Sequence, residues 1–309
     1  MCWFVGTPSV LSDINATRQS FYAALKFNTT FNSCSLLFVA CFRVLFLNLY
    51  FDFTMVLCPR RIEKHRTLNP EGLSEETLMI ERVHSGIEGL DELIHGGFPK
   101  GDFILLAGAS GSGKTIFCTH FICNGVLKYG EKGVYATFEE DRRTLIRNMK
   151  ELGFDLEALE EKGMVKILDL KALKGSGLSS NIELIFENVA NMGAERLVID
   201  SLTAFLSACE EKFEYRTMMH LFYLMLKHRG CTTIATVSIP LGAKTLGLGV
   251  EEFVADGLIM LENFLDGLEL KRRILIRKIR GSDHSKSYHN VLITRKGMEI
   301  VPFASTYSK

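Results

Sequence analysis

The chain has 309 residues, of which 47% are hydrophobic, enough for one large core or two small ones. Lys and Arg together number 36, as do Asp and Glu, so the formal net charge is zero. This balance excludes a global field that would draw the whole chain to nucleic acid or to an anionic membrane. The eight cysteines form no Cys-x-x-Cys pair, which is typical of reduced, mostly buried thiols in a cytoplasmic protein.

The first 58 residues differ in composition from the rest of the chain. They contain only two acids, Asp13 and Asp52, but nine of the chain's 22 phenylalanines and four of its eight cysteines. They show no sustained helical or strand period. We expect residues 1–58 to be an apolar extension that is non-native or poorly ordered.

Three interpretations of this extension stay open. The nearly apolar segment 36–57 is long enough for a membrane anchor, although inserting Arg43 would cost about 2.5–3.5 kcal/mol on insertion scales. The protein would contact a membrane only if this segment is a real anchor. The composition also resembles translated upstream DNA, with Met79 as the more plausible start. The third interpretation is an extension of unrecognised type. A secretory signal peptide fits poorly, since no basic segment or cleavage site frames the apolar run.

Residues 59–78 are polar, carry an Asn-Pro-Glu-Gly sequence at 69–72, and predict a linker. Residues 79–309 then predict one domain. Its first element is a short helix over 85–94 with Leu90, Leu93 and Ile94 on one face, followed by a loop over 95–101.

Strands and helices alternate through the next part of the chain. The predicted strands are 103–107, 133–138, 164–168, 196–200 and 231–237, and the predicted helices are 116–127, 141–152, 181–192 and 214–228. This alternation is typical of βαβ units, which predict an α/β fold with a mostly parallel central sheet and helices on both faces. After Pro240, strands at 256–262, 271–280, 291–294 and 298–301 lack long helices between them and predict an antiparallel C-terminal extension.

The segment Gly108–Thr115 fits G-x-x-x-x-G-K-[ST], the phosphate-binding P-loop or Walker A motif. It lies between a predicted buried strand and a predicted helix. Its glycines let backbone N–H groups converge on a phosphate, whose charge the helix dipole favours. Lys114 would reach the β- and γ-phosphates, and the Thr115 hydroxyl would bind Mg²⁺.

Acidic residues end two of the predicted strands. Asp200 follows the apolar residues Leu197, Val198 and Ile199 in the Walker B pattern and would help to hold Mg²⁺ at the carboxyl edge of the sheet. Glu139 and Glu140 end the strand 133–138, where a carboxylate could orient and deprotonate the water that attacks the γ-phosphate. Acids at a helix N-terminus, favoured by the dipole alone, are the structural alternative for this pair.

Residues 271–296 hold nine basic residues and one acid, Asp283. Alternation along a strand would place Lys278 and Arg280 on one face, where two cations could bind the phosphate of a nucleotide or of a nucleic acid. A solvated edge strand protected by charge is the structural alternative.

Six segments in one order resemble the KaiC domain of the RecA/RadA-type P-loop ATPases, in a single-domain form. They are Ser85–Asp91, His95–Gly101, the P-loop, Phe138–Glu140, the strand ending at Asp200, and Lys278–His284. The resemblance covers roughly residues 79–303. The P-loop by itself indicates an NTPase, whereas the paired glutamates and the Lys-x-Arg-Gly segment narrow the resemblance to KaiC-like proteins.

The resemblance implies ATP and Mg²⁺ as cofactors and a role for each matching residue. The ATP-binding residues would be Gly108, Gly111, Ser112, Gly113, Lys114, Thr115 and Ile116. Glu139, Glu140 and Lys114 would be catalytic, and Thr115 and Asp200 would hold the metal. Lys278, Arg280, Ser282 and His284 would act in trans, at the nucleotide of the neighbouring subunit in a ring, usually a homohexamer.

The expected function is therefore a cytoplasmic Mg-ATP-dependent ATPase that acts as a regulatory or signalling switch, with a signalling partner that the sequence does not identify. Some KaiC-like domains phosphorylate themselves on adjacent Ser/Thr residues. The matching residues 250–256 of this chain lack such acceptors, so autokinase activity is not expected. A RadA-related DNA-binding recombination or repair accessory is the alternative, but zero net charge makes nucleic acid the less favoured partner.

Overall fold

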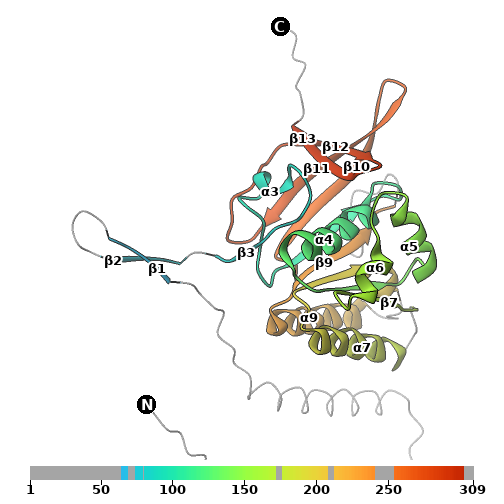
Figure 1. Cartoon of the computed structure of the whole chain (residues 1–309), viewed down its shortest axis with the longest axis horizontal. Coiled ribbons are helices and arrows are strands. Elements are labelled where there is room, and N and C mark those ends of the chain that lie inside the picture. Colours follow the sequence, from blue (N-terminus) through green and yellow to red (C-terminus); the bar gives the residue numbers. More distant parts are fainter. Residues whose placement is uncertain are drawn as a thin grey trace, which may run out of the picture. The chain divides into compact units, whose positions relative to one another are not determined.

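The computed structural model describes residues 64–68, 74–78, 80–171, 176–207, 212–240 and 254–302 (Figure 1). The extension 1–58, with its apolar segment 36–57, lies outside the described residues, and so do Met79, the predicted turn at 69–72 and most of 250–256. No helix in the described ranges is both long enough and apolar enough to cross a membrane.

A nine-stranded sheet forms the centre of the fold, with the strand order β13-β12-β11-β10-β5-β9-β8-β6-β7. Its parallel part comprises β5 (Phe103–Gly108), β6 (Gly133–Thr137), β7 (Val165–Asp169), β8 (Arg196–Asp200), β9 (Thr232–Ser238) and β10 (Gly257–Asp266). The antiparallel part adds β11 (Glu269–Ile279), β12 (His289–Thr294) and β13 (Gly297–Pro302) to β10. The predicted α/β class, with an antiparallel C-terminal extension, is confirmed.

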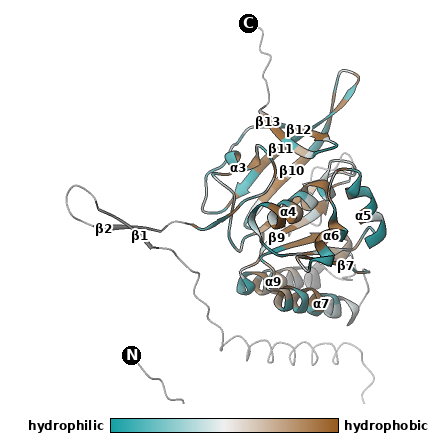
Figure 2. Cartoon of the chain, viewed as in Figure 1, coloured by the Kyte–Doolittle hydropathy of each residue, from teal (hydrophilic) through white to brown (hydrophobic). Residues whose placement is uncertain are grey.

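Helices cover both faces of the parallel strands, which Figure 2 colours as hydrophobic. Along β5, Ile104 and Leu106 pack with α3 (Leu90–Leu93), α4 (Lys114–Tyr129), α5 (Arg142–Lys150) and α6 (Leu156–Glu161). The alternate residues Phe103, Leu105 and Ala107 pack with α7 (Ser176–Met192), α8 (Leu202–Leu206) and α9 (Lys212–Arg229). Side chains of a strand point to opposite faces in turn, so β5 is buried on both.

Two short helices, α6 and α8, were not predicted. Each begins at a polar cap: Asp155 accepts a hydrogen bond from the Ala158 amide at 3.1 Å, and Ser201 accepts one from the Ala204 amide at 3.1 Å. With only six and five residues, these helices are too short to show a clear apolar period.

The segments before the P-loop strand also differ in detail from the prediction. The helix expected over 85–94 is limited to α3, and the expected loop contains β4 (Phe98–Pro99), which pairs antiparallel with β3 (Arg82–Val83). Within the predicted linker, β1 (Lys64–Leu68) pairs antiparallel with β2 (Ser74–Leu78). Short pairings of this kind depend on a partner strand, so they leave a weak local pattern.

A buried histidine connects the P-loop helix α4 to the antiparallel extension. The Met298 amide donates to Nε2 of His120 at 2.5 Å, and a side chain at Gly297 would lie 2.1 Å from the same nitrogen. Burial, with the nearby charge of Lys128, lowers the pKa of His120 to about 4. Protonation of Nε2 would remove the acceptor for Met298, so this contact requires a neutral imidazole.

This contact predicts a loss of stability in mild acid. Between pH 6.5 and about 4 the unfolded chain protonates His120 while the folded chain does not, so the unfolded state binds more protons and the free energy of unfolding falls as pH falls. The full difference is about 3 kcal/mol. We expect His120→Gln to reduce this pH dependence in urea unfolding. The matched change at the exposed His220, His220→Gln, should leave it as in wild type. Equal pH slopes in all three proteins would contradict the prediction.

Candidate functional site

The P-loop connects the carboxyl end of β5 to the first turn of α4. Gly111 and Gly113 have φ values of 75° and 102°, in the left-handed region that favours glycine. Gly113 is the N-cap of α4 and has no side chain to bond the first amides of the helix. The helix N-terminus therefore offers free N–H groups, the usual donors for a bound anion.

The loop is also packed tightly at its start. A Cβ atom at Gly108 would lie 2.5 Å from both Leu261 O and Ser112 Oγ, so a larger residue does not fit there. Within the described part of the chain, the buried Ser112 hydroxyl has no hydrogen-bond partner. An unpaired hydroxyl in a P-loop is a donor available to a phosphate oxygen.

Lys114 folds back over the loop. Its Nζ donates to Gly108 O at 2.8 Å and to Ala109 O at 3.0 Å. Burial lowers the pKa of Lys114, an effect that the charges of Asp200 and Glu139 oppose. The ammonium group is thus held at the loop by two neutral carbonyls, which a phosphate could replace with stronger charge-assisted bonds.

The Asp200 carboxylate joins three elements at the carboxyl edge of the sheet. Oδ2 accepts from Thr115 Oγ1 on α4 and from Tyr135 OH on β6, both at 2.9 Å. Oδ1 accepts from Thr236 Oγ1 on β9 at 2.6 Å. Asp200 is only 8% exposed, and the three hydroxyl donors satisfy both oxygens of this buried side chain.

These contacts also test whether the residues present suit a magnesium ion. The Thr115 hydroxyl and the Asp200 carboxylate are adjacent oxygen ligands, the type that Mg²⁺ prefers. Among the residues the structure describes, no group of three or more His, Cys, Asp and Glu could hold a metal by itself. The pair therefore fits an ion that takes most of its ligands from water and phosphate, as Mg²⁺ does.

The two glutamates after β6 have different surroundings. Glu139 is exposed, and its Oε1 accepts a hydrogen bond from Ser201 Oγ. Glu140 is partly buried, and its Oε1 accepts from Asn148 Nδ2 at 2.8 Å. Burial, helped by the charge of Asp200 and opposed by the Asn148 bond, raises the pKa of Glu140. Two carboxylates thus lie at the edge of the sheet that carries the P-loop.

Sequence reasoning missed the side chains that hold these acids: Tyr135, Thr236, Ser201 and Asn148. The sequence carries a weak signal for two of them. Tyr135 and Thr236 are polar residues in predicted strands, and these strands flank β8 in the sheet. The peptide bond between Asp200 and Ser201 is cis, which no sequence pattern indicated.

The end of β11, which carries the predicted trans residue Lys278, lies near the amino ends of the parallel strands, whereas the P-loop lies at their carboxyl ends. Gly257 on β10 pairs with Ile104 at the start of β5, and also with Ile279 at the end of β11, whereas Leu261 pairs with Gly108. Four residues along a strand span about 13 Å. The end of β11 that carries Lys278 is therefore separated from this chain's own P-loop by the length of β5.

Lys278 and Arg280 each contact the segment that precedes β10. Lys278 Nζ donates to Ala255 O at 2.6 Å, and Arg280 Nη1 lies 3.7 Å from Asp256 Oδ1. A register shift in β11 falls at Arg277, just before Lys278, and β11 ends at Ile279, one residue before Arg280.

Ser282 and His284 follow β11. Ser282 Oγ accepts from Arg82 Nη2 at 2.7 Å. His284 Nδ1 is buried with no hydrogen-bond partner among the described residues. These contacts do not join either residue to the P-loop of the same chain.

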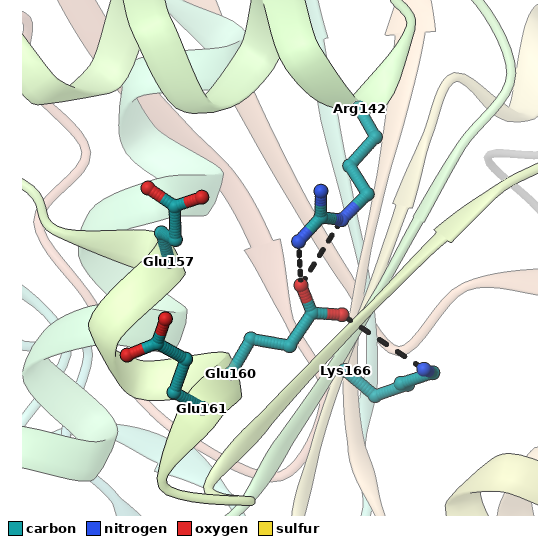
Figure 3. Close-up of a pocket in the computed structure, with 5 residues that line it drawn as sticks. All are labelled: Arg142, Glu157, Glu160, Glu161 and Lys166. Carbon is teal, nitrogen blue, oxygen red and sulfur yellow. Dashed lines mark hydrogen bonds and ion pairs between the residues drawn. The ribbon is translucent and has the colours of Figure 1, made fainter.

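A hollow of about 380 Å³ lies elsewhere, between α5, α6 and β7 (Figure 3). It is lined by Arg142, Glu157, Glu160, Glu161 and Lys166. Glu160 forms an ion pair with each of the two cations: Arg142 Nη2 lies 2.5 Å from its Oε2, and Lys166 Nζ lies 3.9 Å from its Oε1. This hollow is a charged surface basin that contains none of the P-loop residues.

Comparisons with known proteins agree with this arrangement. The model of the KaiC ATPase family matches residues 83–305. The circadian clock oscillator protein KaiC of Parathermosynechococcus lividus is 36% identical, over 73% of this chain and 43% of that protein. KaiC of Synechococcus elongatus is 34% identical, over 75% of this chain and 46% of that protein. The chain thus spans less than half the length of these clock relatives.

Two relatives from Pyrococcus horikoshii match over nearly their whole length. UPF0273 protein PH0284 is 35% identical, over 72% of this chain and 95% of that protein. The crystal structure of KaiC-like protein PH0186 has a TM-score of 0.67 and 39% identity, and the match covers 72% of this chain and 100% of that chain. With a P-loop, a buried strand-end aspartate and a RecA-like sheet in one unit, this chain belongs to the KaiC ATPase family and carries a single KaiC-like domain of the RecA type.

Proposed function

We propose that this protein binds Mg-ATP and hydrolyses it at the interfaces between subunits of a homo-oligomeric ring, and that this hydrolysis drives a regulatory switch. The observation that carries the proposal is the contact between Asp200 and Thr115 beside the P-loop. It brings a P-loop hydroxyl and a strand-end carboxylate within 2.9 Å, from positions 85 residues apart in the sequence.

Each P-loop residue has a role in the bound state that its present contacts support. The amides from Gly111 to Thr115 would surround the phosphates, with the Ser112 hydroxyl as a further donor. Lys114 would exchange its two carbonyl partners for the β- and γ-phosphates. Mg²⁺, held by Thr115 and Asp200, would neutralise charge on the same phosphates.

The two glutamates would activate the attacking water. A general base works best when its pKa lies close to the working pH, and the pKa of Glu140 is raised in that direction. Asn148 and Ser201 would hold the two carboxylates in place through their hydrogen bonds. We therefore assign proton removal to Glu140 and orientation of the water to Glu139.

The positions of the remaining cations support a ring. A γ-phosphate at the P-loop would lie at the carboxyl edge of the parallel strands, whereas Lys278 and Arg280 lie at the opposite edge. They can complete an ATP site only on an adjacent copy of the chain. A single subunit would then lack part of its transition-state charge, so assembly would control turnover.

DNA binding receives less support. Two cations of the run from Lys271 are paired with acids: Lys271 with Asp266, and Arg273 with Glu262. Phosphate-driven binding of nucleic acid needs a surface of cations available to phosphate. We also propose a cytoplasmic location, since Cys118, Cys123 and Cys231 are buried free thiols.

Replacing both catalytic carboxylates tests the ATPase assignment. We expect Glu139→Gln/Glu140→Gln to reduce turnover by at least about 100-fold, because the water loses its base. ATP affinity should stay within about threefold, since the P-loop is untouched. Phosphate release and equilibrium binding of a fluorescent ATP analogue measure the two effects.

Two controls accompany that measurement. Lys114→Ala should abolish binding, whereas Glu161→Gln on the exposed face of α6 should change neither quantity. Turnover that survives in the double glutamine variant would show that these carboxylates are not catalytic.

Co-expression of two inactive variants tests the trans site. A Lys114→Ala subunit retains intact cations, and a Lys278→Met/Arg280→Gln subunit retains an intact P-loop. In a random 1:1 ring, about a quarter of the interfaces combine both intact parts, so about a quarter of wild-type turnover should return. Each variant expressed alone serves as the control. A mixture as inactive as its components would show that the cations do not act across an interface.

A further inference from the structure

The β10–β11 hairpin, drawn in orange in Figure 1, continues past the part of β10 that pairs with β5. On β10, Leu261 pairs with Gly108, the last residue of β5, and Asn263 lies two residues further on. Asn263 pairs directly with Arg272 on β11. Side chains of a direct cross-strand pair project from the same face of a sheet, so these two lie together beside the P-loop.

Both side chains donate a hydrogen bond to the P-loop backbone. Arg272 Nε lies 3.1 Å from Gly111 O, and Asn263 Nδ2 lies 3.3 Å from Ser110 O. The acceptors are carbonyls of two successive peptides. In a trans peptide the C=O and N–H groups point in opposite directions, so holding the Ser110 carbonyl toward the hairpin directs the Gly111 amide away from it.

The neighbouring cations of β11 have other partners. Lys271 pairs with Asp266, and Arg273 pairs with Glu262 and stacks over the ring of Tyr288. Arg272 lies between them in the sequence and bonds the P-loop instead. Lys271 and Arg273 therefore lie on one face of β11 and pair with acids, whereas Arg272 lies on the other face and contacts the P-loop.

We propose that Asn263 and Arg272 are positioning residues that hold the P-loop in its phosphate-binding shape, so that the antiparallel extension sets the affinity for the nucleoside triphosphate. We call this pair of hydrogen bonds to the P-loop backbone the brace. That the ligand is a nucleoside triphosphate rests on the proposed function, whereas the brace rests on the two hydrogen bonds alone. A loop held in shape helps the ground state and the transition state alike, so its loss should raise KM and leave kcat nearly unchanged.

The test compares two near-isosteric changes at one position. Arg272→Met removes the donor, whereas Arg272→Gln places an amide nitrogen where Nε was and removes only the charge. We expect the Met variant to raise the KM for ATP about fivefold, as for one lost hydrogen bond, with kcat within about twofold. The Gln variant should stay close to wild type. Asn263→Ala should act like Arg272→Met, and the exposed Lys271→Met serves as the control.

Amide hydrogen exchange of the peptide covering 108–114, measured without nucleotide, separates the brace from the proposed function. We expect faster exchange in Arg272→Met and Asn263→Ala than in wild type, and wild-type exchange in Arg272→Gln and Lys271→Met. Unchanged exchange and KM in Arg272→Met would overturn the brace. A Gln variant as impaired as the Met variant would also overturn it, because charge would then matter and not the hydrogen bond. Faster exchange in a protein that binds no ATP would support the brace and refute the proposed function.

Discussion

The buried carboxylate of Asp200 is the constraint on which the rest of the site depends. It ends β8 and accepts hydrogen bonds from hydroxyls on α4, β6 and β9. Hydrogen bonds to a charged group contribute about 1.5–3 kcal/mol each, and a buried carboxylate that lost them would be destabilising. One of the three bonds that satisfy the buried acid, from Thr115, also ties the P-loop helix α4 to the sheet.

The sheet that carries this carboxylate also separates the two halves of the proposed ATP site. Because β10 is parallel to β5 while β11 is antiparallel to β10, the chain reaches Lys278 only after returning to the amino edge of the parallel strands. The P-loop and the two glutamates remain at the carboxyl edge. The directions of these strands thus explain why one subunit would hold only part of the proposed ATP site and would need a neighbouring subunit to complete it.

The antiparallel extension is more than an edge of the sheet. It contacts the P-loop through Arg272 and Asn263, and it contacts α4 through the Met298 amide and His120. Both contacts reach the element that would hold the phosphates, one at its loop and one along its helix. A change at the extension, such as contact with a neighbouring subunit, could therefore alter nucleotide affinity without touching the nucleotide.

Local patterns in the sequence were sufficient for the P-loop, for the strand that ends in Asp200 and for the parallel order of strands and helices, because each depends on residues adjacent in the chain. The short helices α6 and α8, the register shift in β11 and the partners of the acids were not predictable in this way. Thr236 lies 36 residues from Asp200, and Arg272 lies 161 residues from Gly111. Such pairs meet only when strand order and register are set by packing of the whole sheet, and no local pattern encodes that distance.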